Sequence, residues 1–153
     1  MVTSPAELQP ELCNCLALRQ AARHVTQFYD GYLASAGLRT TQFSILAKLM
    51  RAGPLTINAL AERMVMDRTT LGRNIQPLER EGLIVTKPGV RDRRSKELHL
   101  TAAGETRLRA AFKAWAQAQA QFETTFGKRR ASDMRAMMRD VAASHLGAAA
   151  SAL

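Results

Sequence analysis

The sequence is poor in the features that mark secreted, membrane-spanning or disulfide-bonded proteins. It has only two cysteines, Cys13 and Cys15, and because residues two apart on a helix do not face each other, no disulfide framework is expected. No apolar run is long enough to cross a bilayer, and the first residues lack the basic and apolar regions of a secretory signal. We therefore expect a reduced, cytoplasmic protein with no membrane partner.

Residues in the patterns that build catalytic and metal sites are also scarce. The three histidines, His24, His99 and His145, lie far apart and outside any cluster of cysteines or carboxylates with the spacing of metal ligands. The sequence has neither a glycine-rich phosphate loop nor a G-x-S-x-G turn. These absences predict a protein with no catalytic residues, no metal and no cofactor.

Acidic residues are outnumbered by basic ones, and the imbalance is local. The 22 Lys and Arg against 13 Asp and Glu give a net charge of +9. Residues 63–96 alone hold nine basic and four acidic side chains, a balance of 9 − 4 = +5. More than half of the charge thus lies in less than a quarter of the chain, which favours nucleic acid first, and a membrane surface second, as the partner.

Apolar residues recur at helical spacing along most of the chain. The pattern predicts helices over about residues 11–36, 40–51, 58–64, 67–81 and 102–126, and a last helix that Ser132 caps. Residues 83–86 and 97–100 alternate as in a β-hairpin. This order predicts a mainly α fold with a small β-hairpin wing, in which the third and fourth helices and the hairpin form a winged helix-turn-helix.

The loop of the predicted hairpin is strongly basic. It holds Lys87, Arg91, Arg93, Arg94 and Lys96 against one acid, Asp92. A cationic loop on a rigid ribbon fits a groove lined with phosphates, although a charged hairpin tip can also be a solvated loop without a partner. The helix before the hairpin favours the first interpretation.

That helix, residues 67–81, has two distinct faces. A narrow apolar stripe contains Leu71, Ile75 and Leu78. The opposite face holds Thr69, Arg73, Gln76 and Arg80, with Thr70 on its flank. Arg and Gln can form bidentate hydrogen bonds with base edges, and Thr can contact a base or a thymine methyl group. Ordinary surface helices also have such a face, but the basic wing directly downstream favours DNA recognition.

Two residues of this helix are unusual for a helix interior. Gly72 would let the backbone come close to whatever this surface meets. Pro77 cannot donate a hydrogen bond to the carbonyl of Arg73, so it should bend the helix or end its regular part, and we predict a bend.

Several short motifs resemble those of the MarR family of transcriptional regulators. They are Leu60-Ala61-Glu62-Arg63, Asp67-Arg68-Thr69-Thr70, Leu78 to Ile84, Asp92-Arg93-Arg94 and Leu98 to Gly104. The resemblance implies a homodimer whose recognition helices enter successive major grooves of a pseudo-palindromic operator in double-stranded DNA, with the wings in the flanking minor groove. It also implies that Arg94 enters the minor groove and that Asp92 holds it.

The resemblance and the residue patterns together divide the chain. Residues 1–36 would form an N-terminal dimerisation helix, 37–101 the DNA-binding domain, 102–147 the C-terminal dimerisation helices, and 148–153 a frayed tail. The residues expected to contact DNA are Arg68, Thr69, Thr70, Arg73, Gln76, Arg91, Asp92, Arg93, Arg94 and Lys96.

Two kinds of control are compatible with the resemblance. Many members are repressors that a small aromatic or phenolic effector releases, and the candidate ligand residues are Cys15, Arg19, Tyr29, Tyr32, Phe43 and Trp115. Another branch senses organic peroxides through a cysteine bonded to two tyrosines. Cys15 and Tyr29 match that cysteine and one tyrosine, but Thr40 occupies the position of the second. Arg19 could favour a thiolate, whereas the simpler interpretation is that the cysteines are small buried apolar residues.

Overall fold

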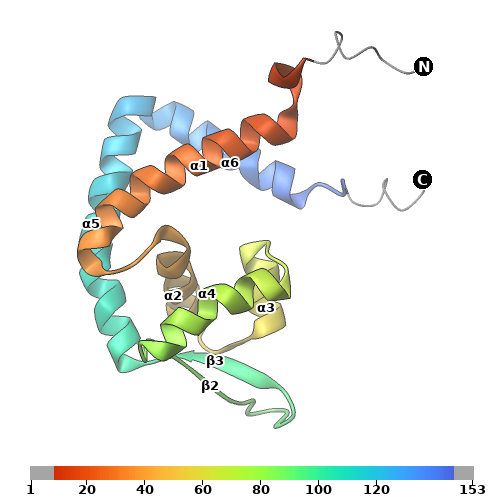
Figure 1. The fold of residues 1–153 in the computed structure, drawn as a ribbon, viewed down its shortest axis with the longest axis vertical. Helices are drawn as coiled ribbons and strands as arrows, with labels where there is room; N and C mark the ends of the chain where they lie inside the picture. The colour runs from red at the N-terminus through yellow and green to blue at the C-terminus, as the bar shows by residue number, and fades with distance from the viewer. Residues whose placement is uncertain (1–8, 147–153) are drawn as a thin grey trace.

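The computed structural model describes residues 9–146 and is mainly helical (Figure 1). The helices are α1 (Asn14–Leu33), α2 (Thr40–Ala52), α3 (Ile57–Met64), α4 (Arg68–Arg80), α5 (Ala102–Phe126) and α6 (Lys128–Ala143). Short 3₁₀ turns cover Pro10–Leu12 and Ala34–Ala36. The strands are β1 (Leu55–Thr56), β2 (Ile84–Pro88) and β3 (Lys96–Leu100). The predicted mainly α fold with a β-hairpin wing is confirmed, while the expected frayed tail at 148–153 lies outside the described residues.

The last helix begins earlier than predicted. Ser132 was expected to cap it, but α6 starts at Lys128 directly after Gly127, so Ser132 lies inside the helix. Gly127 has a φ of 100°, which lets the chain turn between α5 and α6 without a longer connection. In the first turn, the Arg130 guanidinium lies 4.3 Å from the centre of the Phe126 ring, and this contact stabilises the early start.

Two other features of the backbone differ from the sequence prediction or refine it. Strand β1 was not predicted, because two residues are too few to show alternation, yet it pairs with β3 through Leu55 and Leu98. The structure thus contains a three-stranded antiparallel sheet in the order β1-β3-β2. Helix α4 runs through Pro77 to Arg80, so proline does not end it, and the bend stays a prediction.

The core lies in a compact lobe made of α2, α3, α4, the sheet and the adjoining ends of α1 and α5. Its fully buried side chains are Leu33, Ile45, Leu46, Leu49, Leu60, Leu71, Leu78 and Ile84. The buried positions of Leu71, Ile75 and Leu78 confirm the predicted apolar stripe of α4. Helix α4 therefore turns its opposite face outward.

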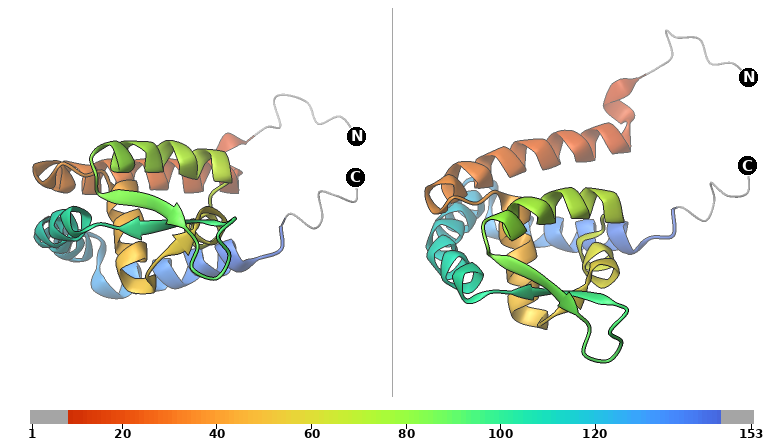
Figure 2. Two further views of the ribbon diagram at one scale, coloured as in Figure 1. Left: turned by 90° about the horizontal axis from the view of Figure 1, so that it is seen from below. Right: turned by 60° about the horizontal axis from the view of Figure 1, so that its bottom comes forward.

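Helices α1 and α6 and the distal half of α5 project from this lobe as a separate arm (Figure 1). Large apolar side chains of this arm face solvent: Met137 of α6 is 62% exposed, and Leu12, in the 3₁₀ turn before α1, is 74% exposed. On the other side of the lobe, the β2–β3 hairpin extends outward as a wing (Figure 2). Within residues 9–146, no helix combines the length and the apolar character that a membrane span requires.

Candidate nucleic-acid interface and ligand cleft

The N-terminus of α4 is held by a cap that uses one of the predicted DNA-contacting residues. The Asp67 carboxylate accepts hydrogen bonds from the Thr70 amide, at 2.8 Å, and from the Thr70 hydroxyl, at 2.6 Å. The side-chain hydrogen bond from Thr70 lowers the pKa of Asp67 and keeps the cap ionised. The Thr70 hydroxyl proton is thereby occupied, so Thr70 orients the start of the helix rather than offering a free donor to a base.

The other residues of α4 that were predicted to contact DNA, and Arg80, are available at the surface. Thr69, Arg73, Gln76 and Arg80 are exposed on the face opposite the buried stripe, and Arg68 is exposed at the first turn. None of these arginines takes part in the ion pairs found within residues 9–146. The face therefore presents unneutralised cations beside neutral hydrogen-bonding groups, the combination that double-stranded DNA requires.

The tip of the wing is a closed turn built on Asp92. Its carboxylate accepts a hydrogen bond from the Arg94 amide at 2.9 Å, and its carbonyl accepts one from the Ser95 hydroxyl at 2.7 Å. Gly89 fits under this turn, since a Cβ there would lie 2.6 Å from the Asp92 carbonyl oxygen. Asp92 thus holds Arg94 through its backbone and leaves its guanidinium free.

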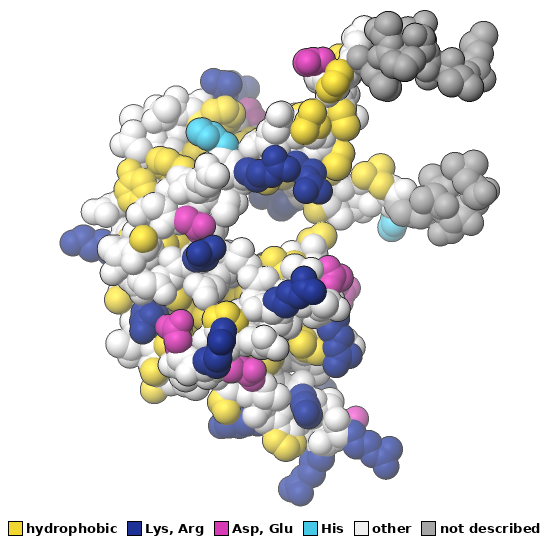
Figure 3. All heavy atoms as spheres, viewed as in Figure 1, with side chains coloured by type: hydrophobic (Ala, Val, Ile, Leu, Met, Phe, Trp, Pro, Cys, Tyr) yellow, Lys and Arg dark blue, Asp and Glu magenta, His cyan; other side chains and the backbone are white. Residues whose placement is uncertain are grey.

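The wing cations point away from the body of the protein. Arg91, Arg93, Arg94 and Lys96 are exposed, and none of them is ion-paired in the described part of the chain. Figure 3 shows Lys and Arg side chains gathered at the end of the molecule where the wing projects. The basic residues predicted to contact DNA are therefore all accessible, on α4 and on the wing.

Specific contacts hold α4, the wing and α5 in one arrangement. The Thr86 hydroxyl of β2 donates to the Glu79 carboxylate of α4. At the end of α4, Glu81 forms an ion pair of 3.3 Å with Arg107 of α5. The Thr101 hydroxyl donates to the Gly82 carbonyl at 2.6 Å, directly before α5 begins. The spacing between the reading face and the wing tip is therefore set by the fold.

A cleft separates the lobe from the helical arm. Its volume is about 460 Å³, and residues of α1, α2, α5 and α6 line it. One wall is aromatic: the rings of Phe43 and Trp115 stack with their centres 5.9 Å apart. Lys48 and Arg51 of α2 add positive charge at the same cleft. The cleft can accommodate a small aromatic molecule, and its charge favours an acidic one.

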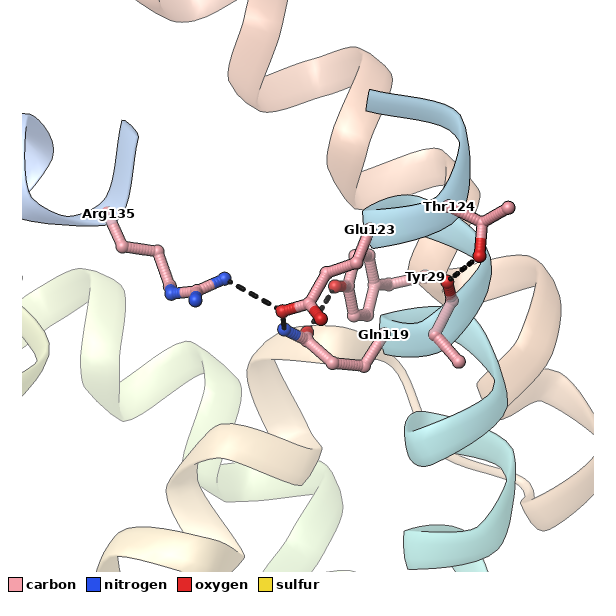
Figure 4. Close-up of polar contacts among 6 residues, drawn as sticks. Tyr29, Gln119, Glu123, Thr124 and Arg135 are labelled. Atoms are coloured by element: carbon pink, nitrogen blue, oxygen red, sulfur yellow. Dashed lines mark hydrogen bonds and ion pairs between the residues drawn. The ribbon is translucent and has the colours of Figure 1, made fainter. Parts of the chain in front are cut away.

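A polar chain crosses the cleft from α1 through α5 to α6 (Figure 4). The Tyr29 hydroxyl donates to the Gln119 side-chain carbonyl at 2.6 Å, and the Gln119 amide donates to Glu123 at 3.0 Å. Arg135 donates to the same Glu123 oxygen at 3.3 Å. Burial, and to a smaller extent the charge of Glu123, raises the pKa of Tyr29, so its hydroxyl remains a neutral donor.

The structure brings together only half of the predicted ligand residues. Tyr29, Phe43 and Trp115 line the cleft, whereas Cys15, Arg19 and Tyr32 do not. Four further cleft residues were not predicted from the sequence; they come from three different helices and are Lys48, Arg51, Gln119 and Arg135. Of these, only Gln119 stands out in the sequence, because it is a polar residue at helical spacing between the aromatic residues Trp115 and Phe122.

The cysteine is far from the tyrosine that it was matched with. Cys15 and Tyr29 lie on the same helix, nearly four turns or roughly 21 Å apart. Thr40, at the position of the second tyrosine, donates both its amide and its hydroxyl to Asp30 at 2.7 Å. Cys13 and Cys15 are both exposed in the single chain, so the expectation that they are buried apolar residues is wrong for this chain alone.

The residues described contain no group of three or more His, Cys, Asp and Glu side chains that could hold a metal ion.

Comparisons with known sequences place the central part of the chain among regulators. A model of the MarR family matches residues 38–96. An uncharacterized HTH-type transcriptional regulator of Bacillus cereus is 32% identical over 96 residues, which are 63% of this chain and 63% of that protein. The organic hydroperoxide resistance transcriptional regulator of Bacillus subtilis is 29% identical over 90 residues, 59% of this chain and 61% of the relative. The matched stretch thus spans less than two thirds of either relative.

A solved structure extends the similarity to nearly the whole fold. The M. tuberculosis transcriptional regulator MosR, in a crystal structure with DNA, is 36% identical, with a TM-score of 0.74. The match covers 88% of this chain and 99% of the MosR chain. The arm and the lobe are therefore both shared with MosR.

Proposed function

Because the chain belongs to the MarR family of transcriptional regulators, we propose that it is a homodimer that binds a pseudo-palindromic operator in double-stranded DNA and represses transcription there. The observation that carries the proposal is that α4 and the wing are held together by specific contacts, while their exposed cations form none of the ion pairs found within residues 9–146. The family and the fold are those of DNA-binding regulators and not of enzymes. We further infer that the protein acts in the cytoplasm, without a catalytic activity.

In this proposal the two parts of the interface have different tasks. Thr69, Arg73 and Gln76 read base edges in the major groove, while Arg94 enters the minor groove. Arg68, Arg91, Arg93 and Lys96 contact phosphates, and counterion release at these contacts supplies most of the affinity. Asp92 and Thr70 support the interface by holding its backbone.

The helical arm serves as the dimerisation region in the same proposal. Residues 1–36 and 102–147 would contribute its helices, and residues 37–101 the DNA-binding domain. The support is the row of exposed apolar side chains on the arm, among them Leu12, Met137 and Val141. Burying such side chains against a second copy would lower the free energy of the dimer.

A titration of duplex affinity against salt tests DNA binding directly. We expect log Kd to rise linearly with log salt, with a slope that corresponds to several phosphate contacts. A random-sequence duplex should bind more weakly than one selected by repeated enrichment on the protein. Affinity that is independent of salt would contradict the proposal.

We propose that the effector is a small aromatic acid or phenol bound in the cleft. Trp115 is the single tryptophan and lies on the cleft wall, so its fluorescence should report binding. Arg51→Ala should weaken binding of an aromatic acid but leave binding of the corresponding uncharged amide unchanged. Equal effects on both ligands would show that Arg51 does not contact the acid.

The second candidate function is peroxide sensing through Cys15. The exposure of both cysteines and the similarity to the B. subtilis hydroperoxide regulator favour it. Any contact between Cys15 and Tyr29 would have to form across the dimer, because the two lie far apart within one chain. Cys15→Ser should then abolish release of DNA by organic peroxide and keep the response to an aromatic acid. Release of the variant by peroxide would exclude this candidate.

A further inference from the structure

Gly72 is a glycine in the interior of α4 that neither its backbone conformation nor its packing within the described residues explains. Its φ is not positive, unlike that of Gly82, so its backbone does not require glycine. Beyond the adjacent residues and backbone of its own helix, a Cβ built on it would meet no atom of residues 9–146 within 4 Å, whereas one at Gly104 would lie 2.1 Å from a carbonyl oxygen. Neither conformation nor internal packing therefore accounts for glycine at this position.

Glycine here also weakens the helix. It has more backbone freedom to lose on folding than alanine, and it occupies the interior of a helix of 13 residues. Nothing else in the described chain contacts the open space above Gly72, so the loss is not offset by folding. A molecule that approaches this point from outside would supply such an offset.

Gly72 lies beside the α4 residues that are proposed to read DNA, so the molecule that would approach it is the same DNA. On the helix surface Gly72 lies roughly 60° from Thr69 and roughly 40° from Gln76, at the edge of the exposed polar face. Thr69 and Gln76 are its neighbours one turn before and one turn after. In Figure 1, α4 crosses the front of the lobe, with its outer side uncovered by the other described elements.

We propose that Gly72 is the point of closest approach between the α4 backbone and duplex DNA. The missing side chain leaves a gap between Thr69 and Gln76 into which a base edge or a sugar–phosphate group fits, and a single methyl group there obstructs docking. The proposal rests on the proposed DNA binding. It adds that specificity depends on a side chain that is absent as well as on those present.

The test compares stability and DNA affinity in the full-length protein with Gly72→Ala. Because the space is open and alanine favours helices, the Tm should rise by about 2–4 °C. Affinity for a duplex selected on the wild-type protein should fall at least about tenfold, because the methyl group pushes the helix away from the groove. If Gly72 has no part in DNA binding, the Gly72→Ala protein would show the higher Tm with unchanged affinity, and that result would overturn the proposal. A lower Tm would also overturn it, since the methyl group would then meet the protein itself.

Asn74→Ala serves as the matched control on the same helix. Asn74 donates to the Thr70 carbonyl at 2.9 Å and is not among the proposed contacts, so its removal should change duplex affinity less than twofold. A tenfold loss in this control would mean that any change in α4 weakens binding, and the inference on Gly72 would fall. Absence of duplex binding by the wild-type protein would overturn the proposed function and this inference with it, whereas equal binding by wild type and Gly72→Ala would overturn this inference alone.

Discussion

Residues of equal charge at the wing tip differ in how firmly their backbone is held. The amide of Arg94 is bonded to the Asp92 carboxylate, which positions the Arg94 side chain at the outer end of the turn. The guanidinium itself has no ion-pair partner in the described chain, so it would break no ion pair of the described chain on entering a DNA groove as proposed. Arg94 therefore has a backbone held by a hydrogen bond and a guanidinium that is not ion-paired in the described chain.

We expect Arg94→Ala to weaken operator binding about tenfold or more and to leave the Tm within about 1 °C. Gel-shift titration and thermal unfolding measure the two effects. Lys113→Ala is the control, since it removes the same charge from an exposed position on α5. If both variants weaken binding equally, the effect is one of net charge and Arg94 has no special position.

The turn between α3 and α4 contains a strained residue. Val65 adopts a left-handed conformation with φ 52° and is 74% exposed, although β-branched residues disfavour this region. Val65→Asn should therefore stabilise the protein by about 1 kcal/mol in urea unfolding, because asparagine tolerates this conformation. Val90→Asn is the control: Val90 is 88% exposed without a positive φ, and its exchange should change stability by less than about 0.5 kcal/mol. An equal gain in both variants would argue against strain at Val65.

At the scale of elements, the root of the wing is the joint on which the interface depends. The Thr101 amide donates to the carbonyl of Leu83, directly before β2, at 3.1 Å, and the first turn of α5 packs against the same carbonyl through Gly104. The ion pair between Arg107 and Glu81 adds a second link to the end of α4. A movement of α5 in the arm would thus be transmitted to the recognition helix and the wing together.

Gly104→Ala should destabilise the protein by about 2 kcal/mol, although alanine is the better helix former. The reason is steric, because the new methyl group would lie 2.1 Å from the Leu83 carbonyl oxygen and must displace the wing root. Chemical unfolding gives the value. The reverse exchange at the exposed neighbour, Ala103→Gly, should cost no more than about 1 kcal/mol. A stabilised Gly104→Ala protein would show that the contact relaxes easily.

At the scale of the whole molecule, the separation into a lobe and an arm creates the cleft in which a ligand would bind. The fully buried large apolar side chains all lie in the lobe, whereas the arm exposes Met137 by 62% and Val141 by 39%. Between them lies the cleft, crossed by the polar chain from Tyr29 to Arg135. A ligand in the cleft would contact both parts, so it is well placed to change their relative position.

Met137→Glu should weaken dimerisation at least about a hundredfold, because it places a charge in the apolar surface proposed to be covered by the second copy. Analytical ultracentrifugation measures the dimer, and operator affinity should fall with it. Gln121→Glu introduces the same charge at an exposed position of α5 and should leave the dimer intact. A fully dimeric Met137→Glu protein would place the interface elsewhere.

The sequence by itself determined the elements and the outward face of the recognition helix. Apolar residues at helical spacing specify which side of a helix is buried, and the burial of Leu71, Ile75 and Leu78 leaves the opposite side for a partner. A long charged hairpin tip cannot be buried, so the wing cations were also predictable. The start of α6 was not, because Gly127 together with the contact between Arg130 and Phe126 outweighs the preference of Ser132 for a helix cap.

Only the tertiary structure decided which side chains meet and which hydrogen bonds each of them forms. Lys48, Gln119 and Arg135 come from three helices, and no local pattern relates them, because a cleft is defined by the packing of segments far apart in sequence. Asp92 and Thr70 belong to the motifs predicted to contact DNA, yet their polar groups are occupied by nearby partners in the turn and the cap. Periodicity sets the face on which a side chain lies, whereas the geometry of the folded chain sets its partner.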